Sequence, residues 1–428
     1  MKRYNAYKDS GVKWIGEIPS HWDTKQFRRF FLIRKDVANC LGYDVLSVTQ
    51  KGLKVKNIES NEGQMANDYS KYQIVEVGDF VMNSMDLLTG YIDCAKQKGV
   101  TSPDYKSFRV RQAINLNKQY YLYIFQFCYK GRIFYNLGRG VSNKGRWRLP
   151  SENLNRFMLP VPPLHEQQAI VDYLKDKTLK IEQYASARER ERELLESLKQ
   201  SEIANVVTKG LNPNAPMKDS GIPWIGMIPE HWTTRKIKVL FKERSEKGYP
   251  NEPVLCATQK YGVIPQSMYE NRVVVVNKGL EGLKLVKEGD FVISLRSFQG
   301  GIEYAHYQGI ISAAYTVLSP SSEVNSDYIK YLFKSHPFIE LLKTCVTGIR
   351  EGQNINYDLL RKSSIMLPPL SEQRAIVTYI DSKLQKIDQY IADLQTEIDY
   401  LKEFKQRLIS DVVTGQIRVA EPQKGEQQ

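Results

Sequence analysis

Residues 367–377 read LPPLSEQRAIV and open a helix-forming run that extends over residues 370–408. Proline at or just before a first turn favours a helix start, and an acidic residue beside it suits the positive end of the helix dipole. Residues 159–171 repeat this opening as LPVPPLHEQQAIV, and a second run extends over residues 164–204. The sequence therefore predicts two long helices as the frame of the molecule.

Apolar side chains recur along both runs at steps of three, four or seven residues, which is typical of a coiled-coil seam. We expect the packed positions to be Leu174, Ile181, Leu195 and Leu198 in the first helix and Ile380, Ile387, Leu394 and Leu401 in the second. Charged residues 188–193 interrupt the first seam. Because Arg and Glu alternate there, we interpret them as a solvated, self-paired face of the helix.

The segment that begins each half of the chain is also duplicated. Residues 8–22 and 218–232 share the pattern KDSGxxWIGxIPxHW, which is too long an identity for chance. Its glycines, prolines and tryptophans indicate a folded segment with aromatic anchors. His21 and His231 stand in this pattern without a neighbouring carboxylate or cysteine motif, so we assign them a structural role.

Composition indicates the class of partner and the compartment. The 428 residues carry a formal net charge of +13, which favours a polyanion such as nucleic acid. Five scattered cysteines without a CxxC motif are typical of a reduced, cytoplasmic protein. The longest apolar patch, residues 120–127, is too short to span a bilayer, so we expect no membrane association.

Polar residues follow predicted strands at matching places in the two halves. One strand in each half ends in a Thr-Gln-Lys triplet, formed by Thr49, Gln50 and Lys51 and by Thr258, Gln259 and Lys260. Such a triplet can contact a base edge or a phosphate in a basic protein, or it can simply form a turn. We leave both interpretations open.

A Gly-Asp pair then precedes an apolar strand in each half. We expect Asp79 and Asp290 to form turns rather than to act as general bases. The residues after these strands differ between the halves, and we include Arg296 among the candidate DNA contacts of the second half.

Residues 105–151 contain ten basic side chains and no acidic one. This imbalance favours a phosphate-facing patch, because a neutral surface would mix both signs. Its richest part is the loop GRGVSNKGRWR at residues 138–148, where we expect Arg139, Lys144, Arg146 and Arg148 to contact DNA. The matching loop of the second half offers Arg350, Gln353 and Asn354. The side-chain amides of Gln353 and Asn354 suit adenine. The alternative is that both loops are ordinary glycine-rich connections.

Motifs for catalysis are missing from the sequence. It contains no glycine-rich cofactor loop with an Asn-Pro-Pro-Tyr-like segment, no clustered carboxylates with a lysine, no zinc spacing and no phosphate loop. We therefore expect a reader of its polyanionic partner, with no catalytic residue, no metal and no cofactor in this chain. Two alternatives are an enzyme that cuts or modifies DNA alone and a coiled-coil scaffold whose basic charge is incidental.

The two repeated patterns, together with VVTKGLNPN at residues 206–214, resemble the DNA-specificity subunit of Type I restriction-modification systems. The resemblance covers nearly the whole chain. It implies an α+β protein with two similar target recognition domains, separated by two long antiparallel coiled-coil helices and related by a pseudo-twofold axis. We expect the domains at residues 1–163 and 211–369, the helices at 164–210 and 370–416, and a disordered tail at 417–428.

The resemblance also implies a function and partners. Each domain would read one half of an asymmetric, bipartite target in double-stranded DNA, and two methyltransferase subunits would dock around the helices. Those partners would use S-adenosylmethionine to methylate adenine at N6. A separate restriction subunit, which translocates DNA, would use ATP and Mg to cut it. Val161 and His165 depart from the second copy, so the register of the central helix stays open.

Overall fold

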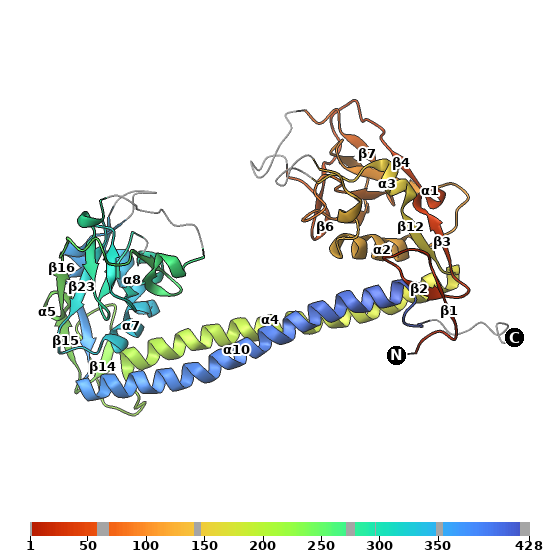
Figure 1. The fold of residues 1–428 in the computed structure, drawn as a ribbon. Coiled ribbons are helices and arrows are strands. Elements are labelled where there is room, and N and C mark those ends of the chain that lie inside the picture. The colour runs from red at the N-terminus through yellow and green to blue at the C-terminus, as the bar shows by residue number, and fades with distance from the viewer. Residues whose placement is uncertain are drawn as a thin grey trace. The chain divides into compact units, whose positions relative to one another are not determined.

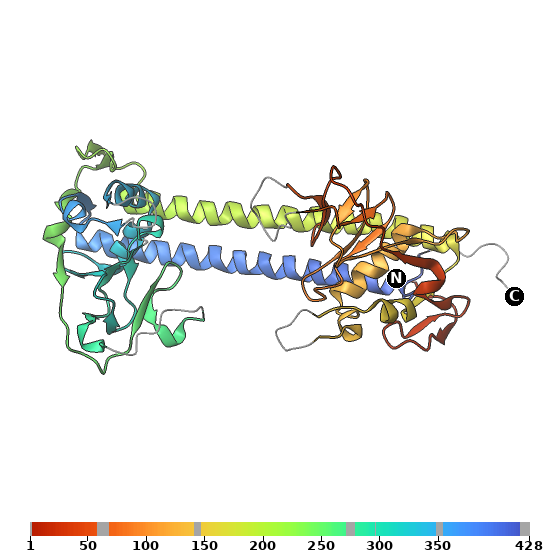
Figure 2. The same ribbon diagram turned by 90° about the horizontal axis from the view of Figure 1, so that it is seen from above.

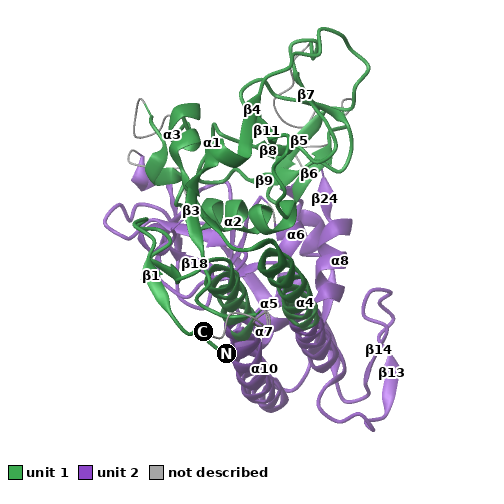
Figure 3. Ribbon diagram, turned by 90° about the vertical axis from the view of Figure 1, so that its right-hand side faces the viewer, with its two compact units in different colours: residues 1–187, 397–428 green, residues 188–396 purple. Residues whose placement is uncertain are grey.

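The computed structural model describes residues 2–57, 68–140, 147–270, 279–295, 297–347 and 354–419 (Figure 1). The chain divides into two compact units, which consist of residues 1–187 with 397–428 and of residues 188–396 (Figure 3). Both boundaries fall within long helices, so each long helix contributes to both units.

Unit 1 contains short antiparallel strands and two helices of more than one turn outside the long pair. Its central sheet has the order β4 (Phe31–Arg34), β11 (Lys106–Val110), β8 (Phe80–Met82), β9 (Ile92–Cys94). Further strand pairs are β1 (Tyr7–Asp9) with β2 (Glu17–Pro19), β3 (Asp23–Gln26) with β12 (Met158–Val161), β5 (Leu46–Thr49) with β6 (Gly52–Val55), and β7 (Gln73–Val75) with β10 (Gly99–Thr101). The helices are α1 (Phe27–Phe30), α2 (Lys118–Lys130) and α3 (Ser151–Arg156), with a 3-10 turn at Tyr135–Leu137.

Unit 2 repeats this arrangement and adds one strand pair, β24 with β25. Its central sheet has the order β16 (Phe241–Arg244), β23 (Thr316–Pro320), β20 (Phe291–Ile293), β21 (Glu303–Tyr304). The other pairs are β13 (Met217–Asp219) with β14 (Met227–Pro229), β15 (Thr233–Lys236) with β26 (Ser364–Leu367), β17 (Leu255–Thr258) with β18 (Gly262–Pro265), β19 (Lys284–Val286) with β22 (Gly309–Ile311), and β24 (Val346–Thr347) with β25 (Asn354–Ile355). Its helices are α5 (Ile237–Leu240), α6 (Ser297–Gly300), α7 (Ser326–Lys334), α8 (His336–Thr344) and α9 (Tyr357–Leu360), with 3-10 turns at Gln266–Met268 and Leu280–Gly282. The internal repeat expected from the sequence is confirmed.

Aromatic side chains fill the space between each sheet and its first long domain helix. In unit 1, Phe27, Phe80 and Phe108 are fully buried, and the rings of Phe80 and Phe108 stack at 5.3 Å. In unit 2, Phe291 and Phe333 meet edge to face at 5.2 Å. Burying one such side chain stabilises a fold by roughly 1.5–3 kcal/mol, so these short strands are held mainly by their aromatic core.

The two long helices are α4 (Leu164–Lys209) and α10 (Leu370–Val413), which run side by side in Figures 1 and 2. α4 begins at the residue expected from the sequence. In unit 1 the start of α4 shares a core with the end of α10, through Leu174 and Val412. In unit 2 the end of α4 shares a core with the start of α10, through Ile203 and Ile376. The helices are therefore antiparallel within each unit, as expected.

Seven of the eight expected seam positions face inward. Leu174, Ile380, Ile387 and Leu394 are buried, and Ile181, Leu195 and Leu401 are half-buried. Leu198 was wrongly placed in the seam, because its side chain is 54% exposed. The inward face of α4 consists instead of Leu195, Lys199 and Ile203, so the residue after Leu198 takes the inward position. Lys199 binds Asp388 of α10 at 2.5 Å.

The charged run at residues 188–193 is only in part the solvated, self-paired face that the sequence suggested, and its exposed members are Arg190 and Glu193. Arg188 and Glu191 do pair with each other, at 2.5 Å. However, Arg192 donates to the Gln395 side chain at 2.5 Å, and the Tyr390 hydroxyl donates to Glu191 at 2.5 Å. These side chains continue the packing of α4 on α10 in unit 2 by hydrogen bonds where apolar residues are missing.

The polar contacts between the helices are themselves repeated. In unit 1 the Tyr184 hydroxyl donates to Glu397 at 2.8 Å, and in unit 2 Tyr390 donates to Glu191 from the equivalent positions. The Lys405–Glu182 pair of unit 1 corresponds in the same way to Lys199–Asp388 of unit 2. The sequence repeat thus extends to individual contacts of the helix pair.

The C-terminal segment is ordered further than expected. Residues 417–419, assigned from sequence to a disordered tail, follow α10 in unit 1, where the backbone N–H of Arg418 donates to the Lys2 carbonyl at 2.9 Å. Residues 420–428 lie outside the described residues. Throughout the described ranges, no helix is both long and apolar enough to cross a membrane.

Candidate nucleic-acid interface

A glutamate at the start of each long helix fastens the duplicated KDSG segment of its unit. Glu166 accepts hydrogen bonds from the Tyr4 hydroxyl at 2.6 Å and the Trp22 indole at 3.1 Å, and it lies 2.5 Å from His21 Nε2. Burial and the contact with Glu166 raise the pKa of Tyr4 well above its ordinary value. The histidine therefore packs against a carboxylate that sequence proximity could not reveal.

Glu372 makes the matching contacts in unit 2, with Trp232 Nε1 at 3.0 Å and His231 Nε2 at 2.7 Å. Both tryptophans are fully buried, which confirms the aromatic anchors expected from the repeat. The repeated histidines and tryptophans thus serve to position each domain on its helix.

A buried tyrosine provides a second repeated contact, which the sequence analysis missed. The Tyr120 hydroxyl of α2 donates to the Val413 carbonyl at the end of α10, at 2.9 Å. The Tyr328 hydroxyl of α7 donates to the Val207 carbonyl near the end of α4, also at 2.9 Å. Both tyrosines are fully buried. A signal was present in the sequence, because each tyrosine stands three residues after an asparagine, Asn117 or Asn325, at the same place of the repeat.

The two Thr-Gln-Lys triplets form hairpin turns. The Thr49 hydroxyl donates to the Gly52 carbonyl at 2.8 Å, and the Thr258 hydroxyl donates to the Gly262 carbonyl at 3.0 Å. Both threonine side chains are therefore engaged within the turn. The side chains of Gln50, Lys51, Gln259 and Lys260 are exposed, so DNA contact remains a prediction for these four.

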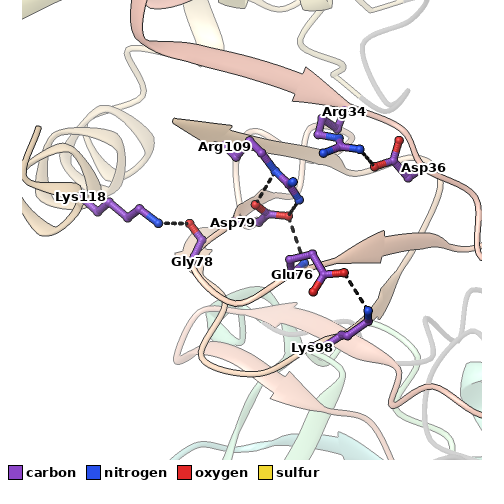
Figure 4. Close-up of polar contacts among 8 residues, drawn as sticks. All are labelled: Arg34, Asp36, Glu76, Gly78, Asp79, Lys98, Arg109 and Lys118. Carbon is purple, nitrogen blue, oxygen red and sulfur yellow. Dashed lines mark hydrogen bonds and ion pairs between the residues drawn. The ribbon is translucent and has the colours of Figure 1, made fainter. Parts of the chain in front are cut away.

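Asp79 and Asp290 form turns as expected and also bind arginine. Asp79 accepts from the Glu76 backbone N–H at 3.0 Å, and Asp290 accepts from that of Lys287 at 2.9 Å. Arg109 donates twice to Asp79, at 3.0 and 2.7 Å (Figure 4). This pair was not visible in the sequence, because Arg109 lies on β11 and Asp79 lies in the turn before β8, thirty residues earlier.

The stretch of ten basic residues is not one continuous phosphate-facing patch. Besides Arg109, Lys118 donates to the Gly78 carbonyl at 3.2 Å (Figure 4). Arg111 donates to the Arg28 carbonyl at 2.8 Å. Lys130 lies over the Tyr91 ring at 5.6 Å. The patch interpretation was wrong for Arg109, whose guanidinium binds a buried carboxylate of the domain. Arg111, Lys118 and Lys130 are exposed, so phosphate contact stays a prediction for these three.

Lys106 is the most deeply placed of these cations. Its side chain donates to the Ser151 hydroxyl at 2.9 Å, and the residue is only 8% exposed. Burial, together with repulsion from Arg148 and Lys35, lowers its pKa to about 8. Lys106 is therefore not available to contact phosphate at the surface.

Arg139 and Arg148 form the base of the basic loop. Their backbones exchange two hydrogen bonds, at 2.8 and 3.0 Å, and both side chains are exposed. Trp147 stacks on Tyr135 at 5.1 Å and covers the loop backbone so closely that a Cβ at Gly140 would come within 2.4 Å of the indole. Lys144 and Arg146 lie outside the described residues, as do Arg296, Arg350 and Gln353.

The loop of unit 2 has the same kind of base but no charge there. Thr347 stands opposite Asn354 in the β24–β25 ladder, and the Asn354 side chain is exposed. Asn356 then caps α9 by accepting from the Leu359 backbone N–H at 3.3 Å. The two units thus present different chemistry at one equivalent position.

The described part of the chain contains no cluster of three or more His, Cys, Asp or Glu side chains suited to a metal ion. What repeats in both units is an α+β domain with exposed polar side chains at the base of one loop, fastened to a shared pair of long helices. This fold and this site define a class of duplicated recognition proteins.

The sequence profile of the type I restriction modification DNA specificity domain matches residues 32–188 and 229–400. The chain belongs to this family. It is accordingly a specificity subunit with two recognition domains, and its role is DNA recognition rather than catalysis.

Known proteins resemble the chain over nearly its full length. A relative from Methanocaldococcus jannaschii, named for the specificity subunit of type I restriction enzyme MjaX, is 24% identical and the alignment covers 96% of this chain and 98% of the relative. A solved structure from work on complex assembly and conformational transition of the type I R-M system has a TM-score of 0.67 at 15% identity, over 94% of this chain and 99% of its own. The structure of the HsdS subunit from Thermoanaerobacter tengcongensis has a TM-score of 0.50 at 17% identity, and the match covers 94% of this chain and 98% of its own. These structures show that the fold is shared.

Proposed function

We propose that this subunit reads an asymmetric, bipartite sequence in double-stranded DNA, with one half-site for each domain. The observation that carries this proposal is the pair of exposed arginines at the loop base of unit 1, Arg139 and Arg148. Like charges directly opposite each other on a ladder destabilise it, and a polyanion in front of them removes that repulsion. Arginine also makes bidentate contacts with guanine and phosphate.

Unlike half-sites follow from the difference between the two loop bases. Unit 2 presents Thr347 and Asn354 where unit 1 presents two arginines. Amide side chains pair with adenine edges, whereas arginine favours guanine or phosphate. We therefore expect the two domains to recognise different bases, with Lys144, Arg146, Arg296, Arg350 and Gln353 as further candidate contacts.

A gap between the half-sites follows from two domains fastened to one helix pair. Tyr120 and Tyr328 anchor their domains by equivalent hydrogen bonds. Two readers that face one side of a duplex favour half-site centres separated by about one helical turn, roughly 34–36 Å. We infer that α4 and α10 act as the spacer and that a pseudo-twofold axis relates the domains.

Exposed apolar pairs on the long helices support two copies of one partner. Leu194 and Leu198 of α4 are 70% and 54% exposed, and Tyr400 and Phe404 of α10 occupy the equivalent positions with 68% and 46% exposed. Large exposed apolar side chains that cluster mark interaction sites. We propose that two methyltransferase subunits, carrying S-adenosylmethionine, dock there. A restriction subunit using ATP and Mg would join the complex in the cytoplasm.

Mapping methylated adenines tests the proposal directly. The chain would be expressed with its methyltransferase partner in cells without other adenine methylation. We expect one bipartite motif with two unlike halves. Arg148→Ala should reduce methylation of that motif, Asn354→Ala should alter only the half read by unit 2, and Arg235→Ala, an exposed arginine on β15, should change neither. A single uninterrupted motif, or a motif unaffected by both loop variants, would refute the proposal.

A further inference from the structure

Unit 2 contains a groove of about 1260 Å³ that the function described so far does not use. Its walls come from the β17–β18 turn, β21, α7 and the inward face of α4. Five tyrosines are among the lining residues, namely Tyr261, Tyr269, Tyr304, Tyr307 and Tyr331. Two of them lie open to solvent, since Tyr261 is 49% and Tyr307 41% exposed.

Unit 1 has a counterpart that serves as an internal reference. The helix wall is equivalent in both units, formed by Lys199, Gln200 and Ile203 in unit 2 and by Lys405, Gln406 and Ile409 in unit 1. The cavity of unit 1 is only about 210 Å³, and its aromatic residues Tyr91, Tyr123 and Phe127 are buried or half-buried. The enlargement and the exposed rings are therefore features of the unit 2 domain alone.

Lysines accompany the tyrosines of this groove. Lys260 Nζ lies 4.9 Å from the centre of the Tyr261 ring, and Lys330 Nζ lies 4.9 Å from that of Tyr331 and 5.5 Å from that of Tyr304. Two other lysines are neutralised, because Lys334 pairs with Glu303 at 2.7 Å and Lys199 pairs with Asp388. Lys330 also pairs with Asp327, at the longer distance of 3.5 Å. Lys260 and Lys330 both place an ammonium group beside aromatic faces.

Alternating cations and open aromatic rings are the chemistry of grooves for single-stranded nucleic acid. The cations follow the phosphates, and the rings stack on bases. A duplex hides its base faces within the stack, so exposed tyrosines in a groove gain little from it. An unpaired strand presents those faces directly.

We propose that the groove of unit 2 binds an unpaired stretch of DNA strand. Bases stack on Tyr261 and Tyr307, and phosphates lie beside Lys260 and Lys330. The inference rests on the proposed function in taking DNA as the partner, and it adds that unit 2 accepts a strand locally separated from its complement. Unit 1, whose cavity is smaller and whose aromatic rings are buried or half-buried, lacks this capacity.

The test measures binding of the full-length chain to a fluorescein-labelled 15-mer of dT at low salt, with a 15-base-pair duplex measured in parallel. Stacking of two bases on tyrosine should strengthen binding by about fivefold or more. Tyr261→Ala/Tyr307→Ala should therefore weaken dT binding at least about fivefold and duplex binding less than about twofold. Tyr249→Ala, an equally exposed tyrosine of unit 2 outside the groove, is the matched control.

A second readout uses an oligonucleotide with one 2-aminopurine. Stacking on tyrosine should quench its fluorescence on binding to the wild type and to Tyr249→Ala, and the double variant should lose the quenching. Unchanged dT affinity in the double variant would overturn the inference, as would equal losses for dT and duplex, which would mean that the groove holds a duplex. A chain that binds neither probe would instead contradict the proposed function itself.

Discussion

Arg109 binds the carboxylate of Asp79 from β11, whereas Asp290, its equivalent in unit 2, is bound by Arg244 from β16 at 2.7 and 3.2 Å. Ser319 of β23 stands where Arg109 stands in unit 1, and it accepts from Arg244 at 3.1 Å. Each unit therefore keeps one arginine for its buried aspartate but takes it from a different strand. The two copies have diverged while satisfying the same electrostatic requirement.

Arg109→Ser is expected to destabilise unit 1 by about 2–4 kcal/mol. Asp79 is only 4% exposed, and removal of its partner leaves a buried carboxylate uncompensated. Urea unfolding followed by tryptophan fluorescence measures the change. Arg34→Ser is the control, because Arg34 pairs with Asp36 at an exposed site and should cost less than about 1 kcal/mol. Equal costs for both variants would contradict the role assigned to the buried pair.

Tyr120→Phe and Tyr328→Phe should each lower stability by about 1 kcal/mol. Each variant removes one buried hydroxyl and leaves a helix carbonyl, that of Val413 or Val207, without its donor. The two effects should add in the double variant, because the tyrosines belong to different units. Tyr400→Phe, at a side chain 68% exposed, should change stability by less than about 0.5 kcal/mol. A similar loss in this control would argue against the anchoring role.

The repeated elements could be predicted because their signals are local in the sequence. The seam at Ile380, Ile387 and Leu394 follows helical periodicity, and the anchors Trp22 and Trp232 stand in a duplicated motif. Periodicity and repetition need no knowledge of the tertiary fold. The frame of the molecule was therefore accessible from the sequence.

The surface chemistry was less accessible, because strand pairing decides it. Arg109 reads as a free cation in sequence, and only the pairing of β11 with β8 brings it to Asp79. Lys106 is buried in the domain for the same reason, and its ammonium group donates to Ser151. Net charge in a segment thus says how many cations are present but not which of them face outward. Arg192, which turns toward α10, shows the same limit on a helix.

The lowered pKa of Lys106 predicts a specific pH dependence of stability. Burial, with Arg148 and Lys35 nearby, lowers the pKa from 10.5 to about 8, so between these values the unfolded chain binds more protons than the folded one. Stability must then rise with pH across that interval. From pH 7.5 to 9.5 this group should add about 2 kcal/mol.

Lys106→Met isolates this contribution. The variant should lack the increase in unfolding free energy that Lys106 contributes, while all other groups keep their pH dependence. The difference in unfolding free energy between variant and wild type should therefore shrink or change sign between pH 7.5 and 9.5. Lys71→Met, at an exposed lysine of unit 1, should leave the wild-type slope intact. Parallel profiles for wild type and Lys106→Met would show that Lys106 titrates normally.

A charge introduced at a seam position of the long helices should lower stability, whereas a charge at an exposed position should weaken partner binding. Ile387→Asp and Leu394→Asp place a carboxylate at sites that are 9% and 2% exposed, and each should cost about 3 kcal/mol or more in unit 2. Leu198→Asp, at a site 54% exposed, should cost less than about 1 kcal/mol yet weaken capture of the methyltransferase partner. Thermal unfolding and co-purification measure the two effects. A loss of stability in Leu198→Asp similar to that of the seam variants would mean that Leu198 does pack in the seam.

Lengthening the helices should widen the gap in the DNA target. One heptad inserted after Ala187 in α4 and another after Thr396 in α10, at the two unit boundaries, keeps the seam in phase and adds about 10 Å. Since base pairs rise by about 3.4 Å, the methylated motif should keep both half-sites and gain roughly three bases between them. Inserting the heptad in only one helix should abolish methylation, because the seam then loses its register. An unchanged gap in the doubly extended chain would mean that the helices do not set the spacing.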